Sequence, residues 1–126
     1  MEGRVMAILL CDDEFMNRKV ASKILNKEGY EVFEAEGAQE AYAILEKESI
    51  ELILMDLMMP RIDGFEAIAY IKAQEAFKHI PILIISALSD QASINKGLEI
   101  GALDYLSKPF DVADFVHRIK QAMAHE

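Results

Sequence analysis

The chain has 126 residues, of which 52% are apolar, and a formal net charge of −9 at pH 7. This size fits one ordinary domain with a substantial core, and the acidic balance disfavours nucleic-acid binding, which needs a basic surface. No run comes near the roughly 20 apolar residues that span a bilayer. The first apolar stretch ends at Cys11-Asp12-Asp13, where a signal peptide would have small residues, so we expect a strand there and a cytoplasmic protein.

Strand and helix patterns alternate along the sequence. Continuous apolar runs predict strands that are covered on both faces, and apolar residues three and four positions apart predict helices. In chain order, the predicted elements are a strand at 5–10, a helix at 14–28, a strand at 30–35, a helix at 38–48, a strand at 50–55, a helix at 65–76, a strand at 81–86, a helix at 91–100, a strand at 104–106 and a helix at 111–124. The second strand is more polar than the others, which favours an edge position.

Three of the helices are predicted from an apolar face, and in the helix at 38–48 this face consists of Ala41, Ile44 and Leu45. The first has Met16, Val20 and Ile24, and the last has Val112, Phe115, Val116, Ile119 and Met123. Five strand–helix units with short connections predict right-handed crossovers and a parallel sheet with helices on both faces. Because no linker, repeat or low-complexity segment interrupts the pattern, residues 1–126 are expected to form a single domain.

Polar residues follow four of the five predicted strands. Asp12 and Asp13 follow the first strand, Asp56 the third, Ser86 the fourth and Lys108 the fifth. Ligands of such sheets bind outside the carboxyl ends of the strands, so these side chains are expected to converge. Three neighbouring carboxylates would repel one another, and a Mg²⁺ ion, which prefers oxygen ligands, would remove the conflict.

This set of residues favours phosphoryl chemistry. With a metal ion and Lys108 nearby, Asp56 remains ionised, and aspartate is a known covalent phosphoryl acceptor. The transfer mainly needs alignment and charge neutralisation, which the Ser86 hydroxyl also supports. Each residue alone has an ordinary alternative as a cap, a turn residue or a surface charge. The second strand contributes only Glu34 and Glu36, which are expected to lie away from the cluster.

From end to end, the sequence resembles the receiver domain of two-component response regulators, of which the chemotaxis regulators are examples. The resemblance is carried by the segments "CDDE", "MDLMMPRIDG", "IISA" and "GLEIGALDYLSKPF" and by the amphipathic last helix. It implies a flavodoxin-like, doubly wound (βα)5 fold of the α/β class, with a five-stranded parallel sheet in order 2-1-3-4-5. It also implies that a histidine kinase or histidine phosphotransfer protein donates the phosphoryl group.

The resemblance implies a role for each matching residue. Asp56 would be the phosphorylation site, and Lys108 would contact the phosphoryl group. For Mg²⁺, Asp13 and Asp56 would be direct ligands, Asp12 would bind mainly through water, and the Met58 backbone carbonyl would complete the protein's share. The Lys108–Pro109 peptide bond is expected to be cis.

A switch pair is also implied. After phosphorylation the Ser86 hydroxyl would move toward the phosphoryl group, and the Tyr105 ring would turn inward into the space left behind. The surface formed by the helix at 91–100, the strand at 104–106 and the helix at 111–124 would carry the signal. Without the resemblance, Tyr105 would be read as a tyrosine that packs on the sheet edge.

Some positions depart from the commoner family pattern or add to it. Ser86 replaces the more frequent threonine, and Met58 and Leu88 place apolar side chains beside the path of the attacking water. We therefore expect slow autodephosphorylation. Gly64, in the loop after Asp56, is expected to adopt a backbone geometry that side chains resist. The first helix, which begins near Phe15, is expected to help dock the phosphodonor.

Other functions remain as alternatives. An aspartate-nucleophile phosphatase of the haloacid dehalogenase type typically has a second Asp two residues after the nucleophile, where this chain has Met58. A flavin-binding electron carrier would need a Ser/Thr/Gly-rich loop in place of "CDDE". A receiver-like interaction module that is never phosphorylated is the third alternative.

If the chain is a receiver domain, we do not expect it to be a conventional enzyme that turns over a separate substrate. The domain would catalyse its own phosphorylation and slow autodephosphorylation, without binding nucleic acid or membrane directly. The sequence leaves open whether it is a single-domain messenger, a relay shuttle or part of a longer chain. It also leaves open whether it is a monomer or a phosphorylation-dependent dimer.

Overall fold

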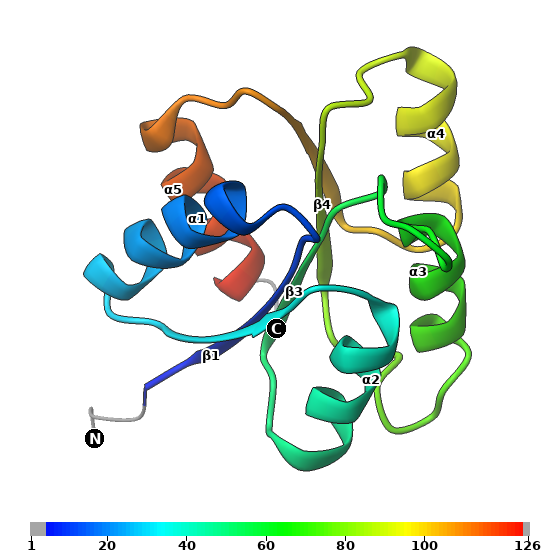
Figure 1. The fold of residues 1–126 in the computed structure, drawn as a ribbon, viewed down its shortest axis with the longest axis horizontal. Coiled ribbons are helices and arrows are strands. Elements are labelled where there is room, and N and C mark those ends of the chain that lie inside the picture. Colours follow the sequence, from blue (N-terminus) through cyan, green and yellow to red (C-terminus); the bar gives the residue numbers. More distant parts are fainter. Residues whose placement is uncertain (1–4, 125–126) are drawn as a thin grey trace.

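The computed structural model describes residues 5–124, and its strands and helices alternate strictly along the chain (Figure 1). The strands are β1 (Ala7–Cys11), β2 (Glu31–Ala35), β3 (Leu52–Met55), β4 (Ile82–Ser86) and β5 (Asp104–Ser107). The helices are α1 (Phe15–Lys27), α2 (Ala38–Lys47), α3 (Gly64–Lys72), α4 (Gln91–Glu99) and α5 (Val112–Ala124). Among these residues, no helix has both the length and the apolar character needed to cross a membrane.

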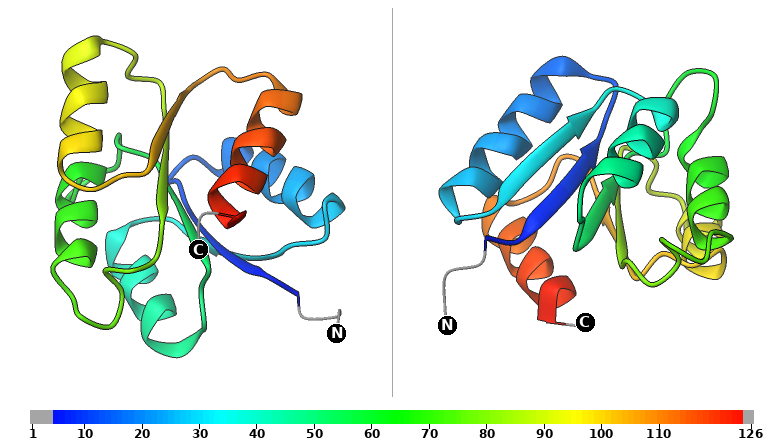
Figure 2. Two further views of the ribbon diagram at one scale, coloured as in Figure 1. Left: turned by 180° about the vertical axis from the view of Figure 1, so that it is seen from behind. Right: turned by 90° about the horizontal axis from the view of Figure 1, so that it is seen from below.

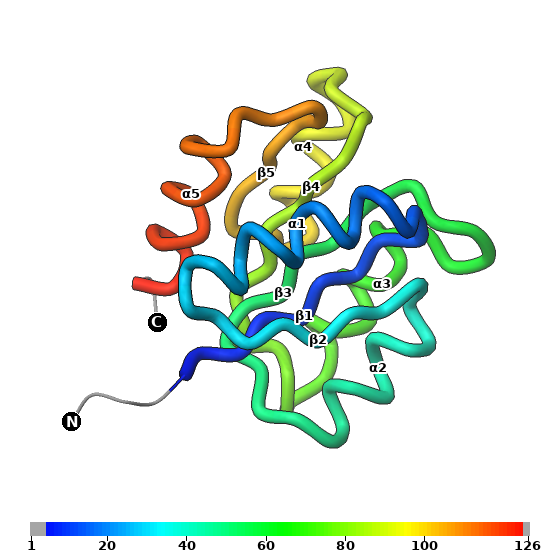
Figure 3. Tube along the Cα trace, turned by 60° about the vertical axis from the view of Figure 1, so that its left-hand side comes forward, coloured from blue at the N-terminus to red at the C-terminus, as the bar shows by residue number. Residues whose placement is uncertain are grey.

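All strand pairs are parallel, and the strands lie in the order β2-β1-β3-β4-β5. The predicted flavodoxin-like α/β fold, its strand order and the polar edge strand are therefore confirmed. Helices α1 and α5 cover one face of the sheet, and α2, α3 and α4 cover the other (Figure 1, Figure 2). Helix α1 contacts both β2 and α5, as the tube in Figure 3 shows.

The sheet divides the core into two apolar clusters. In β3, Ile53 and Met55 belong to the cluster under α2 and α3, whereas Leu52 and Leu54 belong to the cluster under α1 and α5. Successive side chains of a strand point to opposite faces, and all four are fully buried, as expected for a central strand. The register pairs Cys11 with Met55, so β1 and β3 end side by side at one edge of the sheet.

Helix α3 ends at Lys72, four residues before the end that its apolar pattern predicts. The chain then turns so that Phe77 and Ile80 pack against the core. The Lys72 ammonium donates to the carbonyl oxygens of Lys78 and Ile80, both at 3.0 Å. These side-chain contacts stabilise a turn that the apolar periodicity does not reveal. The other predicted boundaries differ from the observed ones by only one or two residues.

The apolar face predicted for the first helix is wrong for two of its three residues, whereas Ile24 is partly buried and packs against the core. Met16 and Val20 are 66% and 53% exposed. The buried residues of α1 are Arg18, Ala21, Ser22 and Leu25. Their spacing is also helical, and the two small side chains let α1 lie close to the sheet. Val112, which the sequence places in the apolar stripe of the last helix, is likewise 53% exposed.

The loop before α3 needs glycine for a different reason than the one predicted. The residue with a positive φ in this loop is Arg61, at 69°, and not Gly64. A Cβ atom on Gly64 would lie 2.4 Å from the carbonyl oxygen of Asp56 and 2.6 Å from Cα of Leu57. Gly64 is therefore required because α3 begins directly against the end of β3.

Replacing Gly64 by alanine should lower the free energy of unfolding by about 1–3 kcal/mol, because overpacking against fixed backbone forces the chain to shift. Denaturant unfolding measures the change. The matched control is Gly37→Ala at the start of α2, where an added Cβ meets nothing within 4 Å. Equal stability of the two variants would contradict the close-approach explanation.

Candidate functional site

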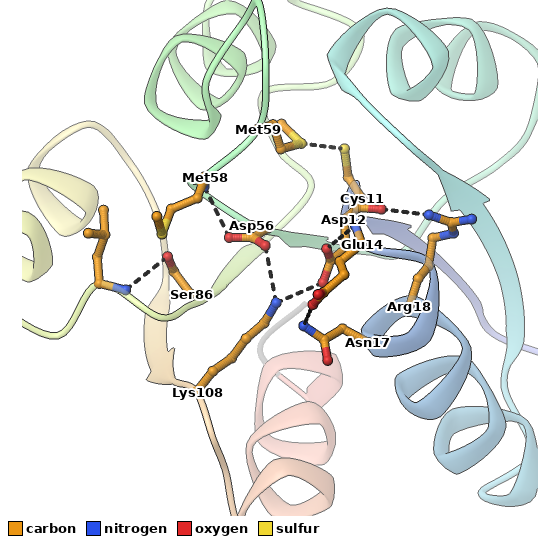
Figure 4. Close-up of polar contacts among 11 residues, drawn as sticks. Cys11, Asp12, Glu14, Asn17, Arg18, Asp56, Met58, Met59, Ser86 and Lys108 are labelled. Carbon is orange, nitrogen blue, oxygen red and sulfur yellow. Dashed lines mark hydrogen bonds and ion pairs between the residues drawn. The ribbon is translucent and has the colours of Figure 1, made fainter.

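The structure brings together the acidic residues and the lysine that the sequence singles out. Carboxylate oxygens of Asp12, Asp13 and Asp56 lie within 4.8 Å of one another. Lys108 Nζ lies 2.8 Å from Oδ2 of Asp12 and 3.1 Å from Oδ2 of Asp56 (Figure 4). Asp12 and Asp56 are buried, whereas Asp13 is exposed. An open cleft of about 420 Å³ lies over Asp13, Asp56 and Lys108.

The two buried carboxylates are held by the same kind of contacts. The N–H of Glu14 donates to Oδ1 of Asp12 at 2.9 Å, and the N–H of Met58 donates to Oδ1 of Asp56 at 3.1 Å. In both cases Lys108 binds the other oxygen. Aspartate readily bonds the backbone two residues later, so the local sequence after each strand fixes its own carboxylate.

Burial and charge act against each other in this cluster. Burial raises the pKa of the Asp56 carboxyl above its ordinary value, although the Met58 N–H and Lys108 favour the charged form. Burial also opposes the charge of Lys108, but its hydrogen bond to Asp12 and the charge of Asp56 outweigh burial and raise the pKa of the ammonium. Lys108 therefore stays protonated beside the Asp56 carboxyl, which is costly to ionise, and a further cation would lower that cost.

Ser86 and Tyr105 lie on the neighbouring strands β4 and β5. Ser86 is fully buried, and its Oγ accepts a hydrogen bond from the Leu88 N–H at 3.3 Å. The Tyr105 hydroxyl donates to the Leu88 carbonyl oxygen at 2.7 Å, and the side chain is buried. The ring therefore already lies inward, where the resemblance implies an inward turn only after phosphorylation. A Cβ atom on Gly97 of α4 would lie 2.5 Å from Cδ1 of Ile84 but at an ordinary contact distance of 3.4 Å from the Tyr105 ring, so the glycine is needed where α4 packs against β4.

Cys11 and the Lys108–Pro109 peptide bond both lie beside the cluster. Cys11 is buried, and its Sγ lies 3.4 Å from Sδ of Met59. Burial, together with the charges of Asp12 and Asp56, raises the pKa of this thiol to about 12. Cys11 is therefore a small core residue and no nucleophile. The Lys108–Pro109 peptide bond is cis, as expected.

Two residues outside the predicted set are connected to the cluster. Arg18 of α1 is buried and donates from Nη1 to the carbonyl oxygen of Asp12 at 2.8 Å and from Nε to Oε1 of Glu34 at 3.0 Å. Glu34 lies outside the carboxylate cluster, as expected, but it is connected to the cluster through Arg18. The available signal was the spacing of Arg18 with Ala21 and Leu25, which a search for apolar residues alone overlooks.

An apolar cavity of about 440 Å³ lies next to the cluster, between α1 and the loop from β5 to α5. Asp12, Asp56 and Lys108 contribute to its wall. Much of the remaining wall is apolar and includes Val20, Ile24, Phe110 and Val112. Val20, an exposed apolar residue of α1, thus lines a hollow that reaches the acidic cluster.

Comparison with known proteins gives the family. The family model described as the response regulator receiver domain matches residues 8–120. The chain belongs to the response regulator receiver domain family. Its relatives include the phosphate regulon transcriptional regulatory protein PhoB of Pseudomonas aeruginosa, which is 37% identical over 116 residues, covering 92% of this chain and 51% of that protein.

Other relatives of this receiver domain are similar over most of their own length. Sporulation initiation phosphotransferase F of Bacillus subtilis is 32% identical over 90% of both chains. The receiver domain of the sensor histidine kinase PA1611 from Pseudomonas aeruginosa, solved with a magnesium ion coordinated in its active site cleft, has a TM-score of 0.88 and 30% identity, covering 96% of this chain and 99% of that chain. The receiver interpretation is confirmed, and the chain spans about half the length of PhoB.

Folded protein should resist alkylation of Cys11 by iodoacetamide at mildly alkaline pH, because burial raises the thiol pKa to about 12. Intact mass spectrometry, with and without denaturant, measures the modification. The same shift predicts that stability falls as the pH rises from 9.0 toward about 12, since the unfolded thiol ionises first. Rapid alkylation of the folded protein would contradict the buried assignment.

Proposed function

We propose that this receiver domain accepts a phosphoryl group on Asp56 from a phosphohistidine of a histidine kinase or histidine phosphotransfer protein. The observation that carries the proposal is the placement of the Asp56 carboxylate. It lies 3.1 Å from the Lys108 ammonium, shares a 4.8 Å cluster with Asp12 and Asp13, and borders an open cleft. A nucleophile for phosphoryl transfer needs this combination of access and nearby positive charge.

Mg²⁺ is the metal that suits this donor set. Three carboxylates offer oxygen ligands to a hard divalent cation, which would hold several waters as well. By resemblance, Asp13 and Asp56 would be direct ligands, Asp12 would bind mainly through water, and the Met58 carbonyl would be the remaining protein ligand. The ion would supply neutralising charge for the carboxylates and for a phosphoryl oxygen. The magnesium ion in the PA1611 receiver supports this assignment.

In the proposed transfer, a carboxylate oxygen of Asp56 attacks the phosphorus atom while the P–N bond of the donor breaks. The imidazole leaves with the electron pair and takes up a proton. Lys108 stabilises the negative charge of the phosphoryl oxygens, and its contact with Asp12 keeps the ammonium aimed at the cleft. The Met58 N–H holds one oxygen of Asp56 and thereby orients the carboxylate.

The phosphorylated state would be transmitted through β4 and β5. A phosphoryl group offers the Ser86 hydroxyl a strong acceptor, so its bond with the Leu88 N–H would be exchanged for one with the phosphoryl group. The inward Tyr105 ring is anchored on the Leu88 carbonyl of the same loop. The surface of α4, β5 and α5 would therefore respond, and a phosphorylation-dependent dimer through it belongs to the proposal.

The exposed apolar residues of α1 support a docking role for this helix. Phe15 and Met16 are 58% and 66% exposed beside the acidic cluster, and Val20 opens onto the neighbouring cavity. We place the phosphodonor there. The output domain or target stays unassigned, and we treat residues 1–126 as one domain acting in the reducing cytoplasm, with which the free Cys11 is compatible.

Incubation with Mg²⁺ and acetyl phosphate should add one phosphoryl group to the protein, and Asp56→Asn should abolish the adduct because the amide is no nucleophile. Intact mass spectrometry measures both results, and EDTA should prevent labelling. The matched control is Asp111→Asn, since this exposed aspartate caps α5 through the Asp114 N–H and asparagine caps equally well. An unmodified wild-type mass would favour the interaction module, and turnover of many phosphoesters would favour the phosphatase.

The phosphorylated protein should lose its phosphoryl group several-fold faster in the double variant Met58→Asn with Leu88→Glu. Polar side chains at these two positions would orient the attacking water, which the present apolar cover excludes. Release of phosphate over time measures the lifetime. Leu98→Gln, at an exposed apolar residue of α4, serves as the control. An unchanged lifetime in the double variant would rule out this role for the two residues.

A further inference from the structure

We infer that Arg18 is a positioning residue for the metal site, because its guanidinium ties the loop between β1 and α1 to the edge strand β2. The inference rests on the proposed function, since it concerns the affinity of that same site for Mg²⁺. Arg18 would contact neither the metal ion nor the phosphoryl group. Arg18 would affect the metal site through its hydrogen bond to the backbone of Asp12.

The contacts of Arg18 connect three segments of the chain. Its side chain is only 6% exposed, which is unusual for an arginine. Nη1 donates to the Asp12 carbonyl oxygen at 2.8 Å, Nε donates to Oε1 of Glu34 at 3.0 Å, and Nη2 lies 3.7 Å from Oε2 of Glu36. A planar guanidinium can serve these partners together because its donors point in fixed directions.

The backbone N–H and the backbone carbonyl of Asp12 are both connected to β2, the first directly and the second through Arg18. Its N–H donates to the Ala35 carbonyl oxygen at 3.0 Å, and its carbonyl oxygen accepts from Arg18. Figure 4 shows Arg18 and Lys108 on opposite sides of Asp12, so the guanidinium holds the backbone while the ammonium holds the carboxylate. The peptide group between Asp12 and Asp13 is thereby fixed, and with it the direction in which Asp13 leaves the strand.

This restraint matters because the site contains mutually repelling groups. The carboxylates of Asp12, Asp13 and Asp56 lie within 4.8 Å of one another, and their charges favour a more open loop. A loop that Arg18 holds closed keeps the ligands near the arrangement that a cation needs. Outer contacts that orient ligands in this way typically change metal affinity by about 10-fold to 100-fold when they are removed.

A different role for Arg18 predicts the opposite change in Mg²⁺ affinity when the residue is replaced. If Arg18 acted only as a nearby positive charge, it would repel Mg²⁺, and its removal would tighten metal binding. In that case Arg18→Lys, which keeps the charge, would bind like the wild type. If Arg18 positions the loop, removal weakens binding, and lysine restores only part of the affinity because one ammonium cannot reproduce the planar fork.

The test is a calorimetric titration of the full chain with Mg²⁺ alone. We expect Arg18→Met to bind about 10-fold more weakly than the wild type or worse, and Arg18→Lys to lie between them. The matched control is Lys72→Met, which also removes a partly buried cation that donates to backbone carbonyls, but at α3 and away from the cluster. This control should unfold at a lower temperature and keep wild-type affinity.

The outcomes separate this inference from the proposed function. Absence of saturable Mg²⁺ binding by the wild type would overturn the proposed metal site itself. Wild-type binding with equal or tighter binding by Arg18→Met would overturn the role of Arg18 alone, as would wild-type affinity in Arg18→Lys. Circular dichroism reports whether each variant is folded, and if Arg18→Met is not, the lysine variant decides the matter.

Discussion

The contact of one ammonium with two buried carboxylates is the interaction on which the site depends. Lys108 meets Asp12 and Asp56, which lie 96 and 52 positions away in the sequence. Carboxylates are costly to bury without a charged partner, and removal of one partner from such a group leaves an uncompensated charge. The sheet register is what makes the contact possible, since β1, β3 and β5 all end at the same edge.

Backbone geometry around the cluster is fixed as closely as its charges. Each buried aspartate is held by the N–H two residues later, and Gly64 lets α3 begin against the end of β3 without a steric clash. The edge strand β2 takes part indirectly, because Glu34 holds the guanidinium of Arg18 and Arg18 holds the Asp12 carbonyl. A strand that contributes no carboxylate to the cluster thus connects to the segment that carries two of the three.

The same edge of the sheet joins the cluster to the end of β5 and to α4. Ser86 and Tyr105 both bond to Leu88, one to its N–H and the other to its carbonyl oxygen. A change at Ser86 therefore acts on the backbone segment that anchors the tyrosine ring. The absence of a side chain at Gly97 lets α4 lie against Ile84 of β4, which pairs with Tyr105 of β5 in the sheet.

The sequence alone determined the alternation of strands and helices, the polar edge strand and the five residues expected at the strand ends, because periodicity and residue type are local properties. The family resemblance supplied the strand order. Tertiary structure decided which face of α1 is buried, where α3 stops, why Gly64 is needed and how Arg18 reaches the cluster. These features depend on contacts between different segments of the chain. Arg18, for example, can be buried because Glu34 and the Asp12 carbonyl oxygen accept its hydrogen bonds, and the local sequence around Arg18 does not predict those contacts.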